Sequence, residues 1–223
     1  MQNNYTQKKT SFPSSTTMKP IQTKTRKKFK IVNKPPKEGK EFRLFDFQTF
    51  DTQPSENERR HFRIQMFGIN EKGETCALFV DNFTPFFYVK LPTHWKVDDA
   101  NEWFLEIKKK CKYSTKDCLS CTVENHSQLY EFTANAEFKF AKCTFRNMSA
   151  LYAFRRVLQE KDHSLPVYES KIPPLLRYFH IQNISPSGWI RICPEEVETP
   201  SEPLTTCTHE YLCNTRDIVP VPE

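Results

Sequence analysis

Cysteine and histidine are the first residues of this chain whose spacing suggests chemistry. Cys118 and Cys121 are separated by two residues, which is the spacing of a zinc-binding pair. The side chains that could complete a four-ligand site are Cys111, Cys143 and His126. A structural zinc site usually needs a second closely spaced pair, and the sequence shows none beside these residues. We therefore favour free or buried thiols and predict no metal site, with zinc as the alternative.

Arg177 and His180 lie in an aromatic stretch and differ in what they could do. A guanidinium between aromatic side chains can hold a buried carboxylate or a phosphate, so Arg177 is a candidate binding residue. A structural ion pair is an equally good interpretation of Arg177. His180 has no acid or nucleophile near it in the sequence, so we predict a packed core histidine there.

The aromatic stretch 83–89 could form a stacking platform for single-stranded nucleic acid. Such platforms combine exposed aromatic rings with nearby cations, and Arg63 and Lys90 are the cations that qualify. The stretch is mainly apolar, however, so we favour the interpretation that its Phe side chains form the hydrophobic core.

Familiar catalytic motifs are missing from the sequence. It contains no Gly-rich phosphate loop, no Gly-x-Ser-x-Gly nucleophile motif and no His-Glu-x-x-His zinc motif. Only four of the 223 residues are Gly, which disfavours a glycine-lined phosphate cradle. We predict no catalytic residue in this chain.

The charge is divided between a basic tail and the remainder of the chain. Residues 1–40 carry eleven Lys and Arg and one acid, a net charge of +10, while the whole chain carries +6 and the remainder therefore −4. This tail is polar and lacks apolar periodicity, so we predict that it is disordered. It contains Arg26, Lys27 and Lys28, which could contact phosphates or form a localisation signal; a solvated tail is the alternative.

The chain contains eight Cys. Its N-terminal segment is polar, and it has no long apolar run. A membrane-spanning helix needs about 20 apolar residues, and no run approaches that length. We therefore expect an intracellular protein with free thiols and no membrane contact.

The positions of these candidates depend on the predicted strands. Alternating apolar residues predict strands over 42–50, 61–68, 75–80 and 83–90. Residues 70–73, Asn-Glu-Lys-Gly, form a hairpin turn between the second and third of them. We expect the last three strands to form an antiparallel meander with an aromatic face.

Two main helices are predicted over 97–111 and 148–160. Asp98 is the expected N-cap of the first helix, and Asn147 or Ser149 that of the second. The predicted apolar stripe of the first is Ala100, Trp103, Phe104 and Ile107, and the predicted face of the second is Met148, Leu151, Tyr152, Arg155 and Leu158. Residues 112–129 are predicted to be irregular, and 129–145 to form two strands.

A closing segment, 168–192, combines several local signals. Pro173 and Pro174 suit the first turn of a helix, residues 185–188 form a turn, and an apolar strand begins at Trp189. An acidic loop over 194–206 and a last strand over 207–213 follow. Together these elements predict an α+β fold with antiparallel β-sheets and two main helices.

Two of these stretches resemble the N-terminal region of family B, delta-like DNA polymerases, in particular those of large nucleocytoplasmic DNA viruses. The first combines Phe67-Gly68-Ile69 and Gly73 with the later run Phe83-Thr84-Pro85-Phe86-Phe87-Tyr88-Val89. The second is the closing segment, YESKIPPLLRYFHIQNISPSGWIRI. The resemblance implies an N-terminal polymerase domain over 41–206, and over 207–223 a strand or linker leading toward a 3′–5′ exonuclease domain.

The polymerase and exonuclease motifs of that family do not occur in this sequence. The chain has no DTDS-like or SLYPS-like string, and it has no Asp-x-Glu pair for an exonuclease. The resemblance therefore implies a non-catalytic portion that frames the template path and supports the exonuclease. It carries no cofactor of its own, whereas the parent polymerase uses Mg²⁺.

The partners implied by the resemblance are template DNA, the exonuclease and palm domains of the parent polymerase and, through the parent, a sliding-clamp processivity factor. The expected location is the site of viral DNA replication. The candidate DNA contacts are Arg63, Lys90, Arg177, Arg26, Lys27 and Lys28. The alternative function is a stand-alone accessory protein that binds single-stranded nucleic acid.

Overall fold

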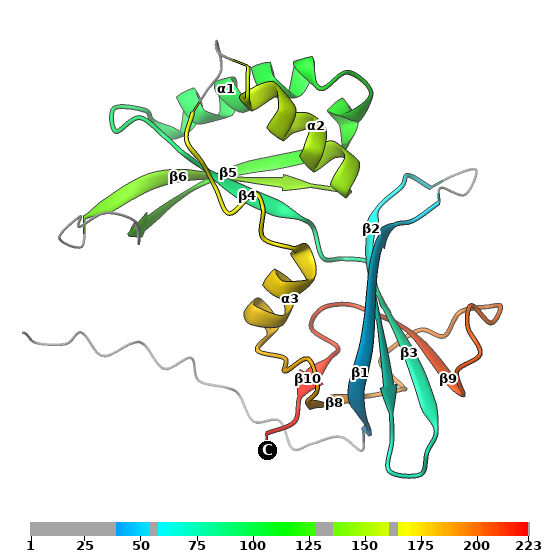
Figure 1. Ribbon diagram of the computed structural model, residues 1–223. Coiled ribbons are helices and arrows are strands. Elements are labelled where there is room, and N and C mark those ends of the chain that lie inside the picture. The colour runs from blue at the N-terminus through cyan, green and yellow to red at the C-terminus, as the bar shows by residue number, and fades with distance from the viewer. Residues whose placement is uncertain (1–38, 54–57, 128–135, 161–164, 223) are drawn as a thin grey trace, which may run out of the picture. The chain divides into compact units, whose positions relative to one another are not determined.

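A computed structural model of the chain describes residues 39–222, except for 54–57, 128–135 and 161–164. The chain divides into a short unit, Met1–Pro35, and a compact unit, Pro36–Glu223, to which every described residue belongs. The predicted disorder of the tail therefore falls outside the described residues, apart from Gly39 and Lys40. The described part contains two β-sheets and three α-helices (Figure 1), which confirms the α+β class. Two of the helices are the expected main helices, and the third lies in the closing segment.

The larger sheet has six strands in the order β10-β8-β1-β2-β3-β9. Their bounds are β1 (Lys40–Asp51), β2 (Phe62–Ile69), β3 (Thr75–Val80), β8 (Trp189–Ile192), β9 (His209–Cys213) and β10 (Val219–Pro220). All neighbours are antiparallel except β3 and β9, which pair in parallel. The predicted strands over 42–50, 61–68 and 75–80 are therefore confirmed as β1, β2 and β3.

The β2–β3 hairpin shows why glycine occupies two positions of the polymerase-like motif. Gly73 closes the turn with a φ of 81°, a left-handed backbone that glycine adopts without strain. A Cβ on Gly68 would lie 3.0 Å from the Phe42 Cβ and 3.2 Å from the Cys76 Sγ. The hairpin turn is confirmed, and Gly68 allows β1 and β2 to approach each other closely.

The smaller sheet has four strands in the order β5-β6-β4-β7. Their bounds are β4 (Phe86–Lys90), β5 (Cys118–Ser127), β6 (Glu137–Phe145) and β7 (Val167–Tyr168). Helix α1 (Val97–Lys110) follows β4, and helix α2 (Met148–Leu158) follows β6, so the chain order is β-α-β-β-α-β with β4 and β6 at the centre. This is a split β-α-β arrangement, in which both helices pack on one face of the sheet and the other face is left open.

The predicted meander is wrong in its third strand. Residues 83–90 do not continue the hairpin, because β4 pairs with β6 and β7 of the smaller sheet. The edge of β3 is occupied instead by β9, which comes from the end of the chain. Pairing with β6 begins at Pro85, whose carbonyl accepts a hydrogen bond from the Phe145 N–H at 2.9 Å.

The prediction for 112–129 is also wrong. A 3₁₀ helix, η1 (Lys112–Asp117), is followed by strand β5, which pairs with β6 along its length. The strand was missed because only one of its faces is packed, so its polar residues hide the alternation. Of the two strands expected over 129–145, the structure describes β6, and residues 128–135 lie outside the described part.

Helices α1 and α2 bury the faces that pack on the smaller sheet. The stripe predicted for α1 is confirmed, but its N-cap is Lys96, whose N–H donates to the Asp99 carboxylate at 2.6 Å. In α2 the N-cap is Asn147, one of the two residues predicted, with its side-chain oxygen accepting from the Ala150 N–H at 2.9 Å. The buried face of α2 differs from the predicted one; it consists of Ala150, Leu151, Phe154, Val157 and Leu158.

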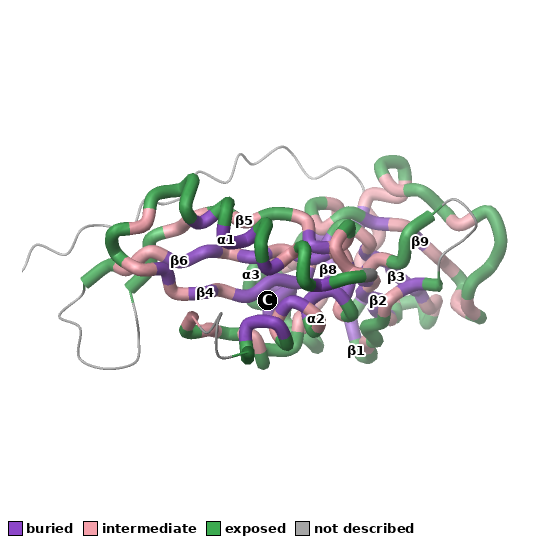
Figure 2. Tube along the Cα trace, turned by 90° about the horizontal axis from the view of Figure 1, so that it is seen from above, coloured by how far each residue is buried: buried purple, intermediate pink, exposed green. Residues whose placement is uncertain are grey.

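The closing segment forms helix α3 (Pro174–Gln182), a turn and β8, as predicted. Pro174 occupies the first helical position, and the helix ends at Asn183, which has a left-handed φ of 54°. The segments after it, β9 and β10, are strands of the larger sheet. Buried residues follow the strands and the inner faces of the helices (Figure 2).

Two hydrophobic clusters form the core, and β4 contributes to both. Phe86 belongs to the cluster of the larger sheet, together with Phe42, Tyr178 and Tyr211. Phe87 belongs to the cluster between the smaller sheet and its helices. The core interpretation of 83–89 is thus confirmed for Phe83, Phe86, Phe87 and Val89. No helix among the described residues is long and apolar enough to cross a membrane.

Candidate nucleic-acid interface

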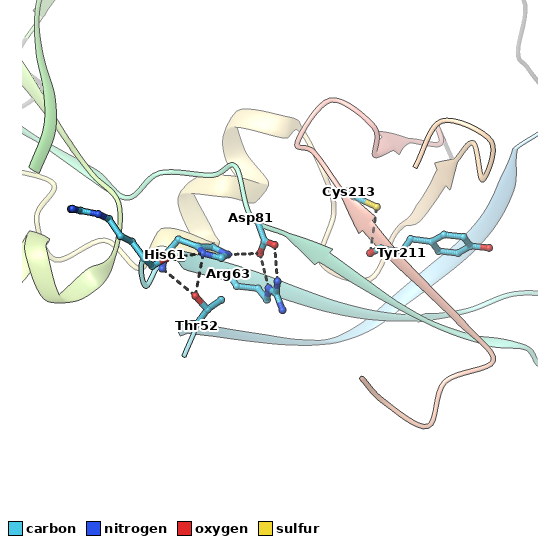
Figure 3. Close-up of polar contacts among 7 residues, drawn as sticks. Thr52, His61, Arg63, Asp81, Tyr211 and Cys213 are labelled. Carbon is cyan, nitrogen blue, oxygen red and sulfur yellow. Dashed lines mark hydrogen bonds and ion pairs between the residues drawn. The ribbon is translucent and has the colours of Figure 1, made fainter. Parts of the chain in front are cut away.

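Arg63, on β2, is held by Asp81, which follows the end of the neighbouring strand β3. Its Nε and Nη2 donate to the two carboxylate oxygens of Asp81 at 2.6 and 2.7 Å (Figure 3). The guanidinium also lies 5.3 Å from the ring centre of Phe79. A bidentate pair of this kind fixes both side chains, so Asp81 offsets the charge that Arg63 would offer to a phosphate.

Thr52, His61 and Asp81 form a line of polar groups beside that ion pair (Figure 3). The Thr52 Oγ1 is 3.2 Å from the His61 Nδ1, and the His61 Nε2 is 3.2 Å from the Asp81 Oδ1. The order of hydroxyl, imidazole and carboxylate is that of a hydrolase triad. Thr52 is buried and already accepts from the His61 backbone N–H, while Asp81 is bound by Arg63. These contacts therefore hold the ends of β1 and β2 together, and they do not expose a nucleophile.

Arg177 is a buried residue of α3 that is held by Glu169. Its Nη1 donates to the Glu169 carboxylate at 2.8 Å and its Nη2 to the Glu169 backbone carbonyl at 3.0 Å. Glu169 has a left-handed φ of 57°, which brings both of its acceptors to the same guanidinium. Arg177 also lies 4.1 Å from the ring centre of Phe86. The sequence left two interpretations of Arg177 open: a binding residue for a carboxylate or phosphate, and a structural ion pair. The structure shows the ion pair.

Lys90 lies at the end of β4, with its ammonium group 3.9 Å from the ring centre of Phe138 on β6. A cation over an aromatic face gains electrostatic attraction and keeps the ring partly covered. Three further predicted contacts, Arg26, Lys27 and Lys28, lie outside the described residues. Among the predicted cations that the structure describes, Arg63, Lys90 and Arg177 each have a local partner of their own.

A cleft of about 860 Å³ lies between the open face of the smaller sheet and α3. One wall is aromatic and comes from three strands; it consists of Phe86, Tyr88, Phe140 and Tyr168. The other wall comes from α3 and the residues before it, with Ile172, Leu176 and Ile181. These three aliphatic side chains are exposed, at 40%, 58% and 50% of their full accessibility. Polar groups are confined to a few positions, including Arg177, Glu169, His126 and His180.

The aromatic wall is a set of rings that support one another. Tyr88 lies edge-on to His126, with ring centres 5.3 Å apart, and Phe140 lies edge-on to Tyr168 at 5.3 Å. Burial raises the pKa of the Tyr88 phenol, and the nearby carboxylates Glu124 and Glu169 add to the shift. The Tyr88 hydroxyl is also hydrogen-bonded to the Glu124 side chain, so what the residue offers to the cleft is mainly its ring.

The prediction for His180 is wrong. It was expected in the core, but it is exposed and lies at the cleft, because the buried residues of α3 are Arg177, Tyr178 and Phe179. The cleft itself was missed by sequence reasoning, since its walls come from strands and a helix that are distant in the sequence. The only signal for the cleft within one stretch is the alternation of Phe86 and Tyr88 on β4, which places both rings on the open face of that strand.

The cysteines of the candidate zinc motif lie close together in pairs. Cys121 faces Cys143 across β5 and β6, and Cys111 and Cys118 are hydrogen-bonded through their side chains. His126 is at the other end of β5, beside Glu124 at 2.9 Å. Within the described residues, no group of three or more His, Cys, Asp or Glu side chains is arranged to hold a metal ion.

Comparison with known proteins identifies several relatives, although no protein-family model matches the chain. It is 33% identical over 205 residues to a DNA polymerase of Phaeocystis pouchetii virus, covering 78% of this chain and 20% of that protein. A DNA polymerase of Acanthamoeba polyphaga mimivirus is 27% identical, covering 81% of this chain and 11% of the relative. The DNA polymerase delta catalytic subunit of Schizosaccharomyces pombe is 24% identical, with 71% and 16% covered.

The fold has a solved counterpart. A family B DNA polymerase from the hyperthermophilic archaeon Pyrobaculum calidifontis matches 82% of this chain and 21% of its own length, with a TM-score of 0.56 and 16% identity. The chain thus spans about a fifth or less of each relative it matches. These matches confirm the resemblance drawn from the two motifs: the chain is a homologue of the DNA polymerases of giant viruses and of the delta catalytic subunits, and it shares its fold with part of a family B DNA polymerase.

Proposed function

We propose that this chain is the N-terminal, non-catalytic portion of a replicative viral DNA polymerase, where it frames the path of the template strand and supports the exonuclease domain. The relatives are DNA polymerases, and the chain corresponds to a fifth or less of their length. In this proposal the remaining domains supply the polymerase and exonuclease chemistry together with the Mg²⁺ ions. The described residues here do not fit that role, because they contain no group of acids arranged to hold a metal.

The observation that carries the template proposal is the aromatic cleft. Its volume of about 860 Å³ lies within the range of about 300–1,000 Å³ typical of ligand pockets. Every base has an apolar face, so an aromatic and aliphatic lining accepts an unpaired base with little regard to sequence. Tyr88 and Leu176 would contact the base, while Phe140, which is 4% exposed with its ring centre 6.5 Å from that of Tyr88, supports the Tyr88 ring. Arg177 keeps the wall in place through Glu169.

The proposed contacts to the strand outside the cleft are Lys90, Arg63 and the tail residues Arg26, Lys27 and Lys28. Among the first two, Lys90 has the better geometry, since it is on the strand that carries Tyr88, whereas Arg63 is bound bidentately by Asp81. The proposed partners are template DNA, the other polymerase domains and, through them, a sliding clamp. The proposed location is intracellular, at the site of viral DNA replication.

The genomic sequence that follows the codon for Glu223 tests the polymerase proposal. An open frame that encodes an Asp-x-Glu strand within a few dozen codons supports it. A stop codon without a polymerase frame nearby would instead support the accessory protein that binds single-stranded nucleic acid. The purified chain should show neither metal-dependent nuclease activity nor nucleotide incorporation, and either activity would contradict a non-catalytic role.

Binding of a labelled single-stranded oligonucleotide, followed by fluorescence anisotropy, tests the cleft. Tyr88→Ala should weaken binding by 1–3 kcal/mol, the value of about one stacked base. Tyr152→Ala is a matched control, because Tyr152 is 48% exposed on α2 and does not line the cleft. Equal affinities for the two variants would remove the cleft from the proposal and leave the genomic test unaffected.

A further inference from the structure

Four of the eight cysteines lie together, in the smaller sheet and at the end of α1. Each belongs to the hydrophobic cluster of that sheet or packs against it; the four are Cys111, Cys118, Cys121 and Cys143. They form two contacting pairs, because Cys111 is hydrogen-bonded to Cys118 and Cys121 to Cys143. All eight cysteines are free thiols, so each pair is a dithiol.

Cys121 and Cys143 differ in how far hydrophobic burial explains them. A buried cysteine behaves as a small apolar residue, which accounts for Cys143, whose side chain has no exposed surface. Cys121 is only partly buried, and it lies on β5, which is the edge strand in the described strand order. Burial alone therefore gives no reason for a second thiol at the accessible position opposite Cys143.

The register of the sheet places these two thiols where a disulfide can form. Cys121 and Cys143 are directly opposed in the antiparallel pair of β5 and β6. Opposed residues in such a pair have Cα atoms about 4.5–5.5 Å apart, and a disulfide requires a Cα separation of about 4.4–6.8 Å. The two side chains already contact each other through their hydrogen bond. Oxidation can therefore join them without a change of register.

The two thiols also differ in reactivity. The hydrogen bond with Cys143 lowers the pKa of the Cys121 thiol, whereas burial raises the pKa of the Cys143 thiol well above its ordinary value. The thiolate is the form that reacts with an oxidant. Cys121 is thus both the more accessible and the more readily ionised thiol, and Cys143 is placed to react with its oxidised form.

We propose that Cys121 and Cys143 are a site of reversible oxidation, at which hydrogen peroxide converts the dithiol into a disulfide that joins β5 to β6. The Cys121 thiolate attacks a peroxide oxygen and the O–O bond breaks, which gives a sulfenic acid and a hydroxide that takes up the proton released by Cys121. The Cys143 sulfur then attacks the sulfenic sulfur, and the S–O bond breaks as hydroxide leaves with the Cys143 proton. Two thiols and one peroxide give one disulfide and two waters.

The disulfide would hold an edge strand whose other face lies at the cleft. On that face, Glu124 is hydrogen-bonded to Tyr88, and His126 lies edge-on to the Tyr88 ring. Because thiols are kept reduced inside cells, such a disulfide would be transient and would form under oxidising conditions. The inference concerns a redox state of the chain and not what the cleft binds, so its failure leaves the proposed function unaffected.

Peptide mapping of the full chain tests the site. The reduced chain is treated with a small molar excess of hydrogen peroxide, the remaining thiols are blocked in denaturant, and the product is digested with trypsin. Cleavage after lysine separates Cys143, in peptide 143–146, from Cys121, which shares peptide 117–139 with Cys118. The expected product is these two peptides joined through Cys143, with the loss of two hydrogen atoms, and dithiothreitol should separate them.

Three variants identify the thiol that is joined to Cys143. Cys121→Ser should lose the cross-link, and it is expected to fold because Cys121 is partly exposed. Cys118→Ala should keep the cross-link. Cys193→Ser is the matched control, since Cys193 is also partly buried but follows β8 of the larger sheet, and it should cross-link like the unmodified chain. Retention of the cross-link in Cys121→Ser, or its loss in Cys118→Ala, would overturn the assignment.

Thermal melting tests the effect of the disulfide on the sheet. Peroxide should raise the melting temperature of the unmodified chain and of Cys193→Ser by about 4 °C or more, the shift expected of a disulfide in a chain of this size, and dithiothreitol should reverse it. Cys121→Ser should melt at the same temperature with and without peroxide. A role in packing alone predicts neither cross-link nor shift, and that result would overturn the proposal. A cross-link without a shift would contradict the stabilisation of β5.

Discussion

Arg177 shows how the chemistry of one residue is decided by a neighbour that the sequence does not indicate. The sequence allowed a buried carboxylate, a phosphate or an ion pair. The structure supplies Glu169, eight positions earlier, with a carboxylate and a carbonyl that both accept from the guanidinium. Because the charge of Arg177 is balanced in this way, its effect on the cleft is to fix the wall made by Phe86 and α3.

Tyr178, the next residue, is expected to tolerate the loss of its hydroxyl. Its side chain is fully buried, burial raises the pKa of its phenol, and its hydroxyl has no hydrogen-bond partner among the described residues. A buried hydroxyl without a partner costs about 1–3 kcal/mol. Tyr178→Phe should therefore raise the free energy of unfolding in urea by about 1 kcal/mol. A loss of stability of that size would show that the hydroxyl has a partner.

At the scale of elements, β9 is the strand that completes the larger sheet. It pairs in parallel with β3. Its central residue, Tyr211, is 4% exposed and packs in the hydrophobic cluster of the larger sheet. Tyr211→Ala should reduce the free energy of unfolding by about 3 kcal/mol, because it removes a buried aromatic ring. Urea denaturation measures the effect, with Tyr152→Ala as the exposed counterpart, expected within about 0.5 kcal/mol of the unmodified chain. Similar losses in both variants would mean that β9 is not needed for the sheet.

Glu74 joins the β2–β3 turn to β9, and its protonation should change the melting temperature of the chain. Glu74 accepts from the Asn70 side chain at 2.6 Å and lies 3.3 Å from the His209 Nε2. These two hydrogen bonds hold the pKa of Glu74 below its ordinary value of 4.5. A lowered carboxyl pKa contributes stability above the ordinary value, and that contribution is lost as the pH falls through the folded-state pKa.

Glu74→Gln should therefore melt at a lower temperature than the unmodified chain at pH 7, and the gap should narrow once the pH falls below 4.5. Thermal melts at a series of pH values measure this gap. If the difference in melting temperature stays constant from neutral to acidic pH, the charge of Glu74 does not contribute to the contact between the β2–β3 turn and β9.

At the scale of the whole described unit, β4 links two hydrophobic clusters. Phe86 and Phe87 are neighbours that point to opposite faces of one strand, and each belongs to a different cluster. Met148 packs against both clusters as well. Loss of either cluster would expose one face of β4, so we expect the two sheets to unfold together.

Tryptophan fluorescence can test this cooperativity, because the three tryptophans report on different sheets. Trp95 and Trp103 pack in the cluster of the smaller sheet, and Trp189 is on β8 of the larger one. In Trp189→Phe and in Trp95→Phe/Trp103→Phe, the urea midpoint by fluorescence should coincide with the midpoint by circular dichroism. Midpoints that differ within one variant would show that the sheets unfold independently.

Elements with local signals could be predicted from the amino-acid pattern alone. The β2–β3 hairpin, with Gly73 in its turn, the stripe of α1 and the Pro-initiated α3 all follow from residues within a few positions of one another. The relationship to family B polymerases was also visible in two short motifs. Such features depend on backbone preferences and on periodic burial, which the neighbouring residues fix without reference to the rest of the chain.

The pairing of the strands and the contacts between distant side chains became clear only in the folded chain. β4 leaves the hairpin for a second sheet, β9 takes its place, and Asp51 at the end of β1 binds the first N–H groups of α2, 97 and 98 positions away. The cleft arises in the same way, from Tyr88, Phe140 and α3. These contacts join distant segments, and they are selected by the burial of two shared clusters, a property of the whole chain that no local pattern contains.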